Sequence, residues 1–153
     1  MTGLFFEDCR DDLTFTSEAR TITESDITAF ASLTGDFSEL HTNEEFARAT
    51  PFGQRIAHGA LVFSLSIGLA TTAVPIGDTL LAFAGVDNLR FVKPVFIGDT
   101  IHILKRLHER REFGPDRGVV VFQTSVINQR KEIVLMYHDK LLLRRRGAAT
   151  SPA

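Results

Sequence analysis

The spacing of apolar residues changes along the chain, from a helical period before residue 75 to a strand-like period after residue 80. The first helix is predicted to begin after Thr23, whose hydroxyl can cap it, and to end at Gly35. Its apolar residues are expected on one face: Ile27, Phe30, Ala31 and Leu33. The Thr-rich residues 4–22 before this helix are expected to be extended.

Two more helices are predicted before the period changes. Thr42 and Glu45 have the spacing of a capping box, which predicts a short helix that stops before Pro51. The segment Gly59–Gly77 is long and almost uncharged, but hydroxyl residues dilute it, and crossing a bilayer takes about 20 mostly apolar residues. A helix from Gly59 to about Thr72, buried at the centre of the domain, is therefore the better interpretation.

Four strands are predicted after residue 80: 80–92, around 101–107, 119–127 and 133–143. Their short connections favour an antiparallel meander. Because the uncharged helix has no polar face, the sheet must wrap around it. Together with one extra N-terminal strand, this predicts an α+β protein with the hot-dog fold, an antiparallel β-sheet wrapped around a long central α-helix.

Length and charge narrow this picture further. The 153 residues are expected to form a single domain over 1–153, with Arg144–Arg146 frayed and about 147–153 a flexible tail. The net charge of −2 gives no reason to expect binding to nucleic acid or to a membrane. Cys9 is the only cysteine, which excludes an internal disulfide. The chain has no recognisable leader before Phe5, so a cytoplasmic location is expected.

The candidate chemistry lies between the first helix and the central helix. Asp36 and His41 are five residues apart in a loop that a glycine introduces, and Gly59 opens the central helix. A carboxylate, an imidazole and the free N–H groups of a helix start are the components of an acid–base site with an oxyanion pocket. Taken singly, Asp36 reads as a turn-forming residue and His41 as an ordinary residue beside a helix.

Two motifs strengthen the chemical interpretation. Gly35-Asp36-Phe37-Ser38-Glu39-Leu40-His41 resembles the signature of the MaoC-like hot-dog hydratases and dehydratases, which include the (R)-specific enoyl-CoA hydratases. Ile56-Ala57-His58-Gly59 resembles the second signature of that family, at the start of its central helix. Arg90-Phe91-Val92-Lys93-Pro94-Val95 and Gly98-Asp99-Thr100 are also similar to family sequences, so the resemblance covers nearly the whole chain.

The resemblance implies a hydro-lyase that adds or removes water across the 2,3-double bond of an enoyl thioester. Asp36 and His41 would hold and activate the water, and the Gly59 N–H would polarise the thioester carbonyl. Which of the two side chains is base and which is acid stays open. The implied substrate carrier is CoA or acyl carrier protein, no cofactor or metal is expected, and relatives suggest a homodimer or a higher even oligomer.

The residues expected to meet the substrate are Ser38, Glu39, Ile56, Ala57, His58, Arg90 and Lys93. Ser38 and Glu39 stand where the (R)-specific hydratases usually have Asn and Pro, which predicts a different substrate preference. His58 is expected mainly to hold the loop through a hydrogen bond. Arg90 and Lys93 are candidates for the CoA phosphates, although solvated surface is the simpler interpretation of each.

Two other functions fit a hot-dog fold. A thioesterase would use a carboxylate to direct water at the carbonyl, but the Asp36–His41 spacing resembles hydratases rather than thioesterases. A non-catalytic acyl-CoA-binding protein would account for the Ser38-Glu39 departure. We keep both as alternatives to the hydratase.

Overall fold

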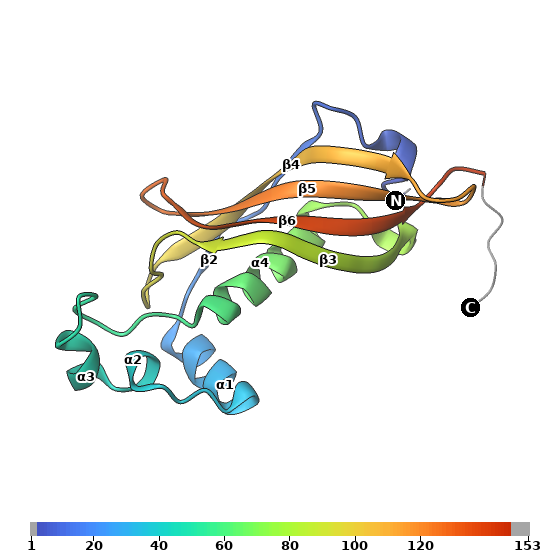
Figure 1. The fold of residues 1–153 in the computed structure, drawn as a ribbon. Coiled ribbons are helices and arrows are strands. Elements are labelled where there is room, and N and C mark those ends of the chain that lie inside the picture. Colours follow the sequence, from blue (N-terminus) through green and yellow to red (C-terminus); the bar gives the residue numbers. More distant parts are fainter. Residues whose placement is uncertain (1–2, 148–153) are drawn as a thin grey trace.

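The computed structural model describes residues 3–147, which form one antiparallel sheet of six strands with a long helix against one face (Figure 1). The elements in chain order are η1 (Phe6–Asp8), β1 (Thr14–Thr16), β2 (Arg20–Thr21), α1 (Glu24–Thr34), α2 (Glu39–Thr42), α3 (Glu44–Arg48), α4 (Gly59–Ala73), η2 (Gly77–Thr79), β3 (Leu80–Phe91), β4 (Thr100–Glu112), β5 (Arg117–Asn128) and β6 (Ile133–Arg144). The predicted hot-dog fold is confirmed.

Helix α1 begins and ends as the sequence predicts. Thr23 caps it: the Asp26 N–H donates to the Thr23 hydroxyl at 3.2 Å, and the Thr23 N–H donates to the Asp26 carboxylate at 2.9 Å. Gly35 ends it with φ 79°, the left-handed conformation that glycine adopts without strain. The expected apolar face is wrong at Leu33, whose side chain is 83% exposed. Residue 33 lies away from the buried face because the helix turns about 100° per residue.

The cap of the next helical segment is also different from the prediction. Asn43, not Thr42, caps α3, because its side-chain oxygen accepts the Phe46 N–H at 3.1 Å. Thr42 instead ends the single turn of α2, and its hydroxyl donates back to the Ser38 carbonyl at 3.1 Å. The extra turn puts His41 on a short helix rather than in an open loop.

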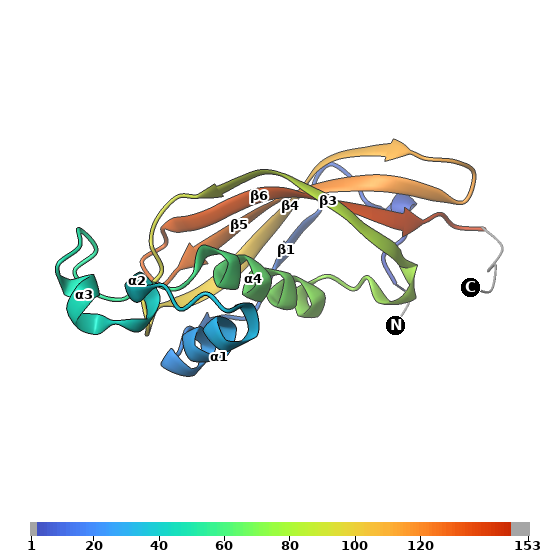
Figure 2. The same ribbon diagram turned by 60° about the horizontal axis from the view of Figure 1, so that its bottom comes forward.

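Helix α4 packs one face on the sheet, with Leu61, Val62, Ser66 and Ala70 buried. The opposite face is exposed at small or hydroxyl residues: Ala60, Ser64, Gly68 and Thr71. The predicted packing of the sheet around this helix is therefore confirmed along one face, and the helix residues that face away from the sheet are small or carry a hydroxyl group. Figure 2 shows α4 under the sheet and α1 beneath the α4 start. Within residues 3–147, no helix has the length and apolarity that crossing a bilayer would demand.

The strand order is β1-β4-β5-β6-β3, with β2 also on β4, so the predicted four-strand meander is wrong at β3. Only β4, β5 and β6 follow one another as neighbours, and β3 lies on the far side of β6. The loop at 92–99 crosses from β3 to β4, and eight residues easily span three strand spacings of ~4.8 Å each. Residues 4–22 form a 3₁₀ turn and two short strands rather than one strand.

Arginines near the end of the chain are ordered, contrary to the prediction of a frayed end. Arg145 pairs with Glu7 at 3.1 Å, and Arg146 pairs with Asp8 at 2.7 Å. These ion pairs fasten η1 to the end of β6. Of the predicted tail 147–153, only Gly147 belongs to the described residues, and 148–153 lie outside them.

Candidate active site

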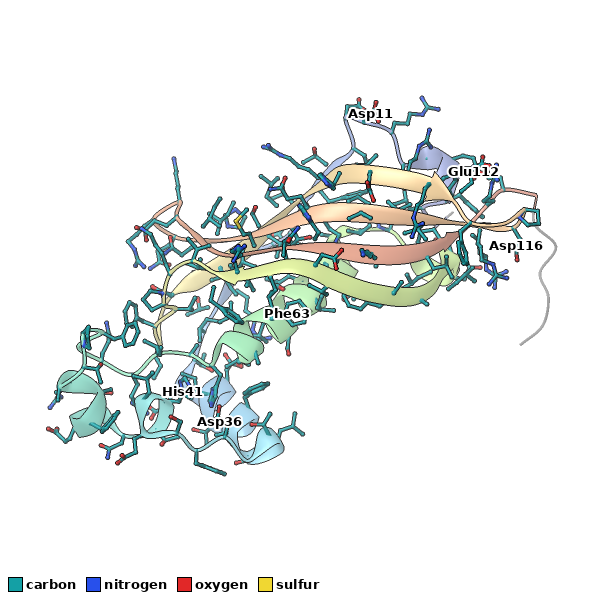
Figure 3. The ribbon with its side chains drawn as sticks, viewed as in Figure 1. Asp11, Asp36, His41, Phe63, Glu112 and Asp116 are labelled. Carbon is teal, nitrogen blue, oxygen red and sulfur yellow. The ribbon has the colours of Figure 1, made fainter. Side chains whose placement is uncertain are left out.

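Asp36 and His41 come together in the segment that leads from α1 to α2. Asp36 is exposed just after the Gly35 turn, and its carboxylate accepts the Ser38 N–H at 3.2 Å. His41 lies on α2, and its Nδ1 is 2.8 Å from the Ile56 carbonyl oxygen. Because a carbonyl only accepts, Nδ1 carries the proton and Nε2 keeps a free lone pair in the neutral ring. Figure 3 shows the two side chains close together below the sheet.

His58 is the buried side chain behind this pair. Its Nε2 lies 3.0 Å from the Asp36 backbone carbonyl, so it donates there and holds the loop, as the sequence predicts. Its ring stacks on His41 with centroids 3.9 Å apart. The residue is only 2% exposed, and its Nδ1 has no hydrogen-bond partner in the described part of the chain. His58 therefore contacts both Asp36 and His41.

The spacing of these groups suits a bound water. Side-chain ligand atoms of Asp36, His41 and His58 all lie within 4.8 Å of one another. Two groups at that separation can each reach the same water at hydrogen-bond distance. Such a cluster could also hold a metal ion, since one nitrogen of each imidazole bonds to a backbone carbonyl and the other remains available as a ligand.

Gly59 opens α4 at the edge of a pocket. His58, the residue before the helix, provides no side-chain cap, so the first-turn N–H groups remain open to an acceptor. The pocket has a volume of about 510 Å³, and both His41 and Gly59 line it. The positive end of the α4 dipole adds to the attraction for a partial negative charge here.

The rest of the pocket wall is largely apolar. It is formed by residues from three parts of the chain: Phe52, Ile56, Val62, Phe91, Val95 and Leu135. Lys93 is its one charged lining residue, and its ammonium lies 2.5 Å from Glu132. Hydrogen bonds from Asn128, Lys93 and Arg130 lower the pKa of Glu132 to about 2. An apolar group fits these walls better than a polar group does.

Only part of the predicted substrate set lies on this wall. Three residues of the set line the pocket: Ile56, Ala57 and Lys93. Four do not: Ser38, Glu39, His58 and Arg90. Glu39 instead accepts a hydrogen bond from Asn43 at 2.9 Å within its own helical segment. Arg90 lines a separate hollow of about 190 Å³ together with residues of β5 and β6.

Phe91 is a site residue to which sequence reasoning assigned no role. Its ring packs so closely on Gly59 that a Cβ added there would lie 2.7 Å from the Phe91 Cε1 atom. Phe91 belongs to the segment Arg90–Val95, which resembles the family, but nothing in that pattern says that it meets the start of α4. Its contact with Gly59 depends on β3 passing over the helix N-terminus.

Comparisons with known proteins agree with this architecture. The sequence profile of the MaoC like domain matches residues 11–129. A 3-hydroxybutyryl-CoA dehydratase of Methylorubrum extorquens is 38% identical over 65% of this chain and 61% of its own length. An (R)-specific enoyl-CoA hydratase of Rhodospirillum rubrum is 38% identical over 63% of this chain and 65% of its own length.

A solved structure of similar size was also found. The structure titled monoamine oxidase regulatory protein, from Archaeoglobus, is 39% identical, with a TM-score of 0.89 over 94% of this chain and 95% of that one. The chain spans less than two thirds of the length of the first curated relatives. The profile match covers most of this sequence, and the fold and both motifs accompany it. The chain belongs to the family of MaoC-like domains.

Proposed function

We propose that this protein is a hydro-lyase that adds or removes water across the 2,3-double bond of an enoyl thioester. One observation carries the proposal: His41 and Gly59 line the same apolar pocket, and a carboxylate oxygen of Asp36 lies within 4.8 Å of a ring nitrogen of His41. The names of the hydratase and dehydratase relatives support the same reaction.

The hydrogen bonds suggest how the water is handled. His41 donates from Nδ1 to Ile56, so Nε2 is the lone pair that takes a proton from the water. Asp36 accepts the second O–H of that water and orients it. The water oxygen then forms a bond to Cβ, the C2–C3 π electrons move toward Cα, and the imidazolium of His41 returns the proton to Cα. Both side chains end in their starting state.

The start of α4 handles the charge that develops on the thioester oxygen. The Gly59 N–H donates to this oxygen more strongly as the enolate forms, and the helix dipole adds to it. Removing one such donor typically raises the barrier by about 3 kcal/mol.

The pocket wall suggests the substrate. Its apolar lining suits an unsubstituted acyl chain, and Lys93 stands at the wall where it could meet a phosphate of the carrier after releasing Glu132. Glu39 is bonded to Asn43 and lies off this wall, so it does not support recognition of a polar group on the acyl chain. We therefore propose a CoA or acyl-carrier-protein thioester with a simple acyl group.

A crotonyl-CoA assay tests the proposal. Loss of the enoyl absorbance without release of free thiol supports the hydro-lyase, and release of thiol without hydration supports the thioesterase alternative. We propose that the reaction needs no cofactor and no metal ion, so dialysis against EDTA leaves the rate unchanged. Binding of acyl-CoA without turnover supports a non-catalytic protein, which the name of the regulatory relative also makes a candidate.

We further propose a homodimer that joins two sheets at β3. This strand pairs with β6 on one side and is the last strand in the sheet order, so its other edge is open. It carries exposed apolar side chains: Leu80, Leu81, Phe83, Leu89 and Phe91. An open apolar edge strand is unfavourable in water and favours pairing with a second strand. A stable, active monomer in a sedimentation dilution series contradicts this proposal.

A further inference from the structure

A row of polar side chains crosses the inner face of the sheet. Lys105 on β4, Thr124 on β5 and Tyr137 on β6 are neighbours in the strand register, and all three are buried. Tyr137 itself belongs to one of the two apolar clusters of the core, and the neighbouring residues Phe122 and Leu141 belong to the other. None of these side chains takes part in the chemistry proposed above, so their burial has another reason.

One end of the row contacts α4. The Tyr137 hydroxyl lies 2.8 Å from the Ser66 hydroxyl, and Ser66 donates its own proton to the Phe63 carbonyl at 2.6 Å. Tyr137 is therefore the donor to Ser66. Burial raises the pKa of Tyr137 to about 12, which keeps this proton in place. The Tyr137 ring also packs edge-on against Phe63, with centroids 5.1 Å apart.

The other end of the row is held by an ion pair. The Lys105 ammonium bonds the Asp139 carboxylate and donates to the Thr124 hydroxyl at 3.1 Å. Thr124 in turn donates to Asp139 at 2.7 Å. A buried network in which each member has partners is rigid and favours one arrangement of the surrounding core.

The contact with Ser66 is unusual for α4. Within residues 3–147, no other side-chain hydrogen bond joins α4 to the sheet, because Ser64, Thr71 and Thr72 bond to their own helix. The remaining contacts of α4 with the sheet are apolar, and apolar attraction has no preferred direction. A hydrogen bond has a narrow range of distance and angle, so it defines where the helix lies along the sheet.

We propose that the Tyr137–Ser66 hydrogen bond fixes the position of α4 along the sheet and thereby places the Gly59 N–H in the active site. Ser66 lies about two helical turns after Gly59, so a shift at Ser66 is transmitted through the rigid helix. Tyr137 is then a positioning residue that acts through α4 and does not touch the substrate. This inference rests on the proposed hydratase function.

The test compares Tyr137→Phe and Ser66→Ala with the control Ser64→Ala, whose hydroxyl bonds only within α4. We expect Tyr137→Phe and Ser66→Ala each to lower kcat on crotonyl-CoA about tenfold, with KM within about twofold, because a small misplacement of a catalytic donor has a large effect on rate. The double variant should be no slower than either single variant, since both remove the same bond. Ser64→Ala should match the wild type.

A second readout does not depend on turnover. The backbone amide resonances of Gly59 and Ala60 should shift in Tyr137→Phe and Ser66→Ala, but not in Ser64→Ala. A lower melting temperature with wild-type kcat and unchanged Gly59 resonances would overturn the inference, because the bond would then only stabilise the fold. If the wild type shows no hydration, the proposed function fails, and the amide resonances still decide whether Tyr137 positions the helix.

Discussion

The imidazole rings of His41 and His58 lie face to face, with centroids 3.9 Å apart and planes inclined by 30°. His58 also donates to the Asp36 carbonyl at 3.0 Å, so one buried side chain orients both members of the proposed dyad. It directly precedes Gly59 as well, and three parts of the site therefore meet at one residue.

This arrangement predicts a kinetic effect of His58→Phe. Phenylalanine keeps a ring against His41 but removes the bond to the Asp36 carbonyl, so the loop loses its anchor. We expect kcat on an enoyl-CoA to fall by about 10- to 100-fold, because moving a catalytic group by about 1 Å can slow a reaction about 100-fold. His138→Phe, on β6 outside the site, is the matched control. A folded His58→Phe with wild-type kcat would show that the anchor is dispensable.

The contact of Gly59 with Phe91 makes a second prediction. Gly59→Ala keeps the backbone N–H, but its Cβ would lie 2.7 Å from the Phe91 ring and force one of the two groups to move. We expect a loss of at least about tenfold in kcat/KM. The same change made in a Phe91→Ala background should lose less, which a double-mutant cycle measures. Additive losses would mean that contact with the Phe91 ring is not the reason why residue 59 must be glycine.

The buried ion pair predicts that removing one partner lowers the stability more than replacing both. Lys105 and Asp139 are 2% and 1% exposed, so Lys105→Met leaves an unpaired charge in the core. Breaking such a pair typically destabilises by about 3–5 kcal/mol. Adding Asp139→Asn removes that charge and keeps an acceptor for Thr124, so the double variant should recover much of the loss. Urea unfolding at neutral pH measures both, and equal losses in the two variants would contradict this explanation.

The carboxyl groups of Glu132 and Asp99, which bond to residues in and around the turn after β5, are expected to control how the stability falls in acid. Hydrogen bonds from Asn128, Lys93 and Arg130 lower the pKa of Glu132 to about 2. Burial alone would raise the pKa of Asp99, but hydrogen bonds from Gln129, the Phe96 N–H and Arg130 hold it below its usual value.

Since both groups bind protons more weakly when folded, their stabilisation is complete above the unfolded pKa values near 4 and is lost as the pH falls toward 2. The urea midpoint should therefore drop between pH 5 and pH 2.5. A Glu132→Gln variant should start with a lower midpoint and show a shallower drop. If the wild type and the variant lose stability in parallel, other groups control the acid transition.

Local signals account for most of the fold that the sequence predicts. The Thr23 cap, the Gly35 end and the four long strands depend on neighbouring residues, and the structure bears them out. The neighbours of β3 are set instead by the path of the loop at 92–99 across the sheet, which no local pattern encodes. Thr42 and Asn43 are both good capping residues, and Asn43 caps α3 because Thr42 already belongs to the extra turn of α2.

The residues of the site likewise include some that the sequence predicts and some that it does not. Asp36, His41, His58 and Gly59 lie in two short motifs, and the motifs alone predict that they belong together. The places of Phe91 and Tyr137 depend on contacts between β3, β6 and α4, so spacing along the chain cannot reveal them. Ser38 and Glu39 lie between the two members of the dyad in sequence, yet they do not line the pocket, and α2 begins at Glu39.

The central claim is that Asp36 and His41 activate water for addition to an enoyl thioester, and one comparison tests it most directly. The initial rate of crotonyl-CoA hydration is measured for the wild type, Asp36→Asn and His41→Ala, with far-ultraviolet circular dichroism to verify folding. We predict that each variant stays folded and loses at least about a thousandfold in rate. His41→Ala removes the group that transfers the proton, which typically contributes about 10²–10⁴-fold, and Asp36→Asn replaces the charged acceptor of the water with a neutral amide. Near wild-type turnover in either folded variant would contradict the claim.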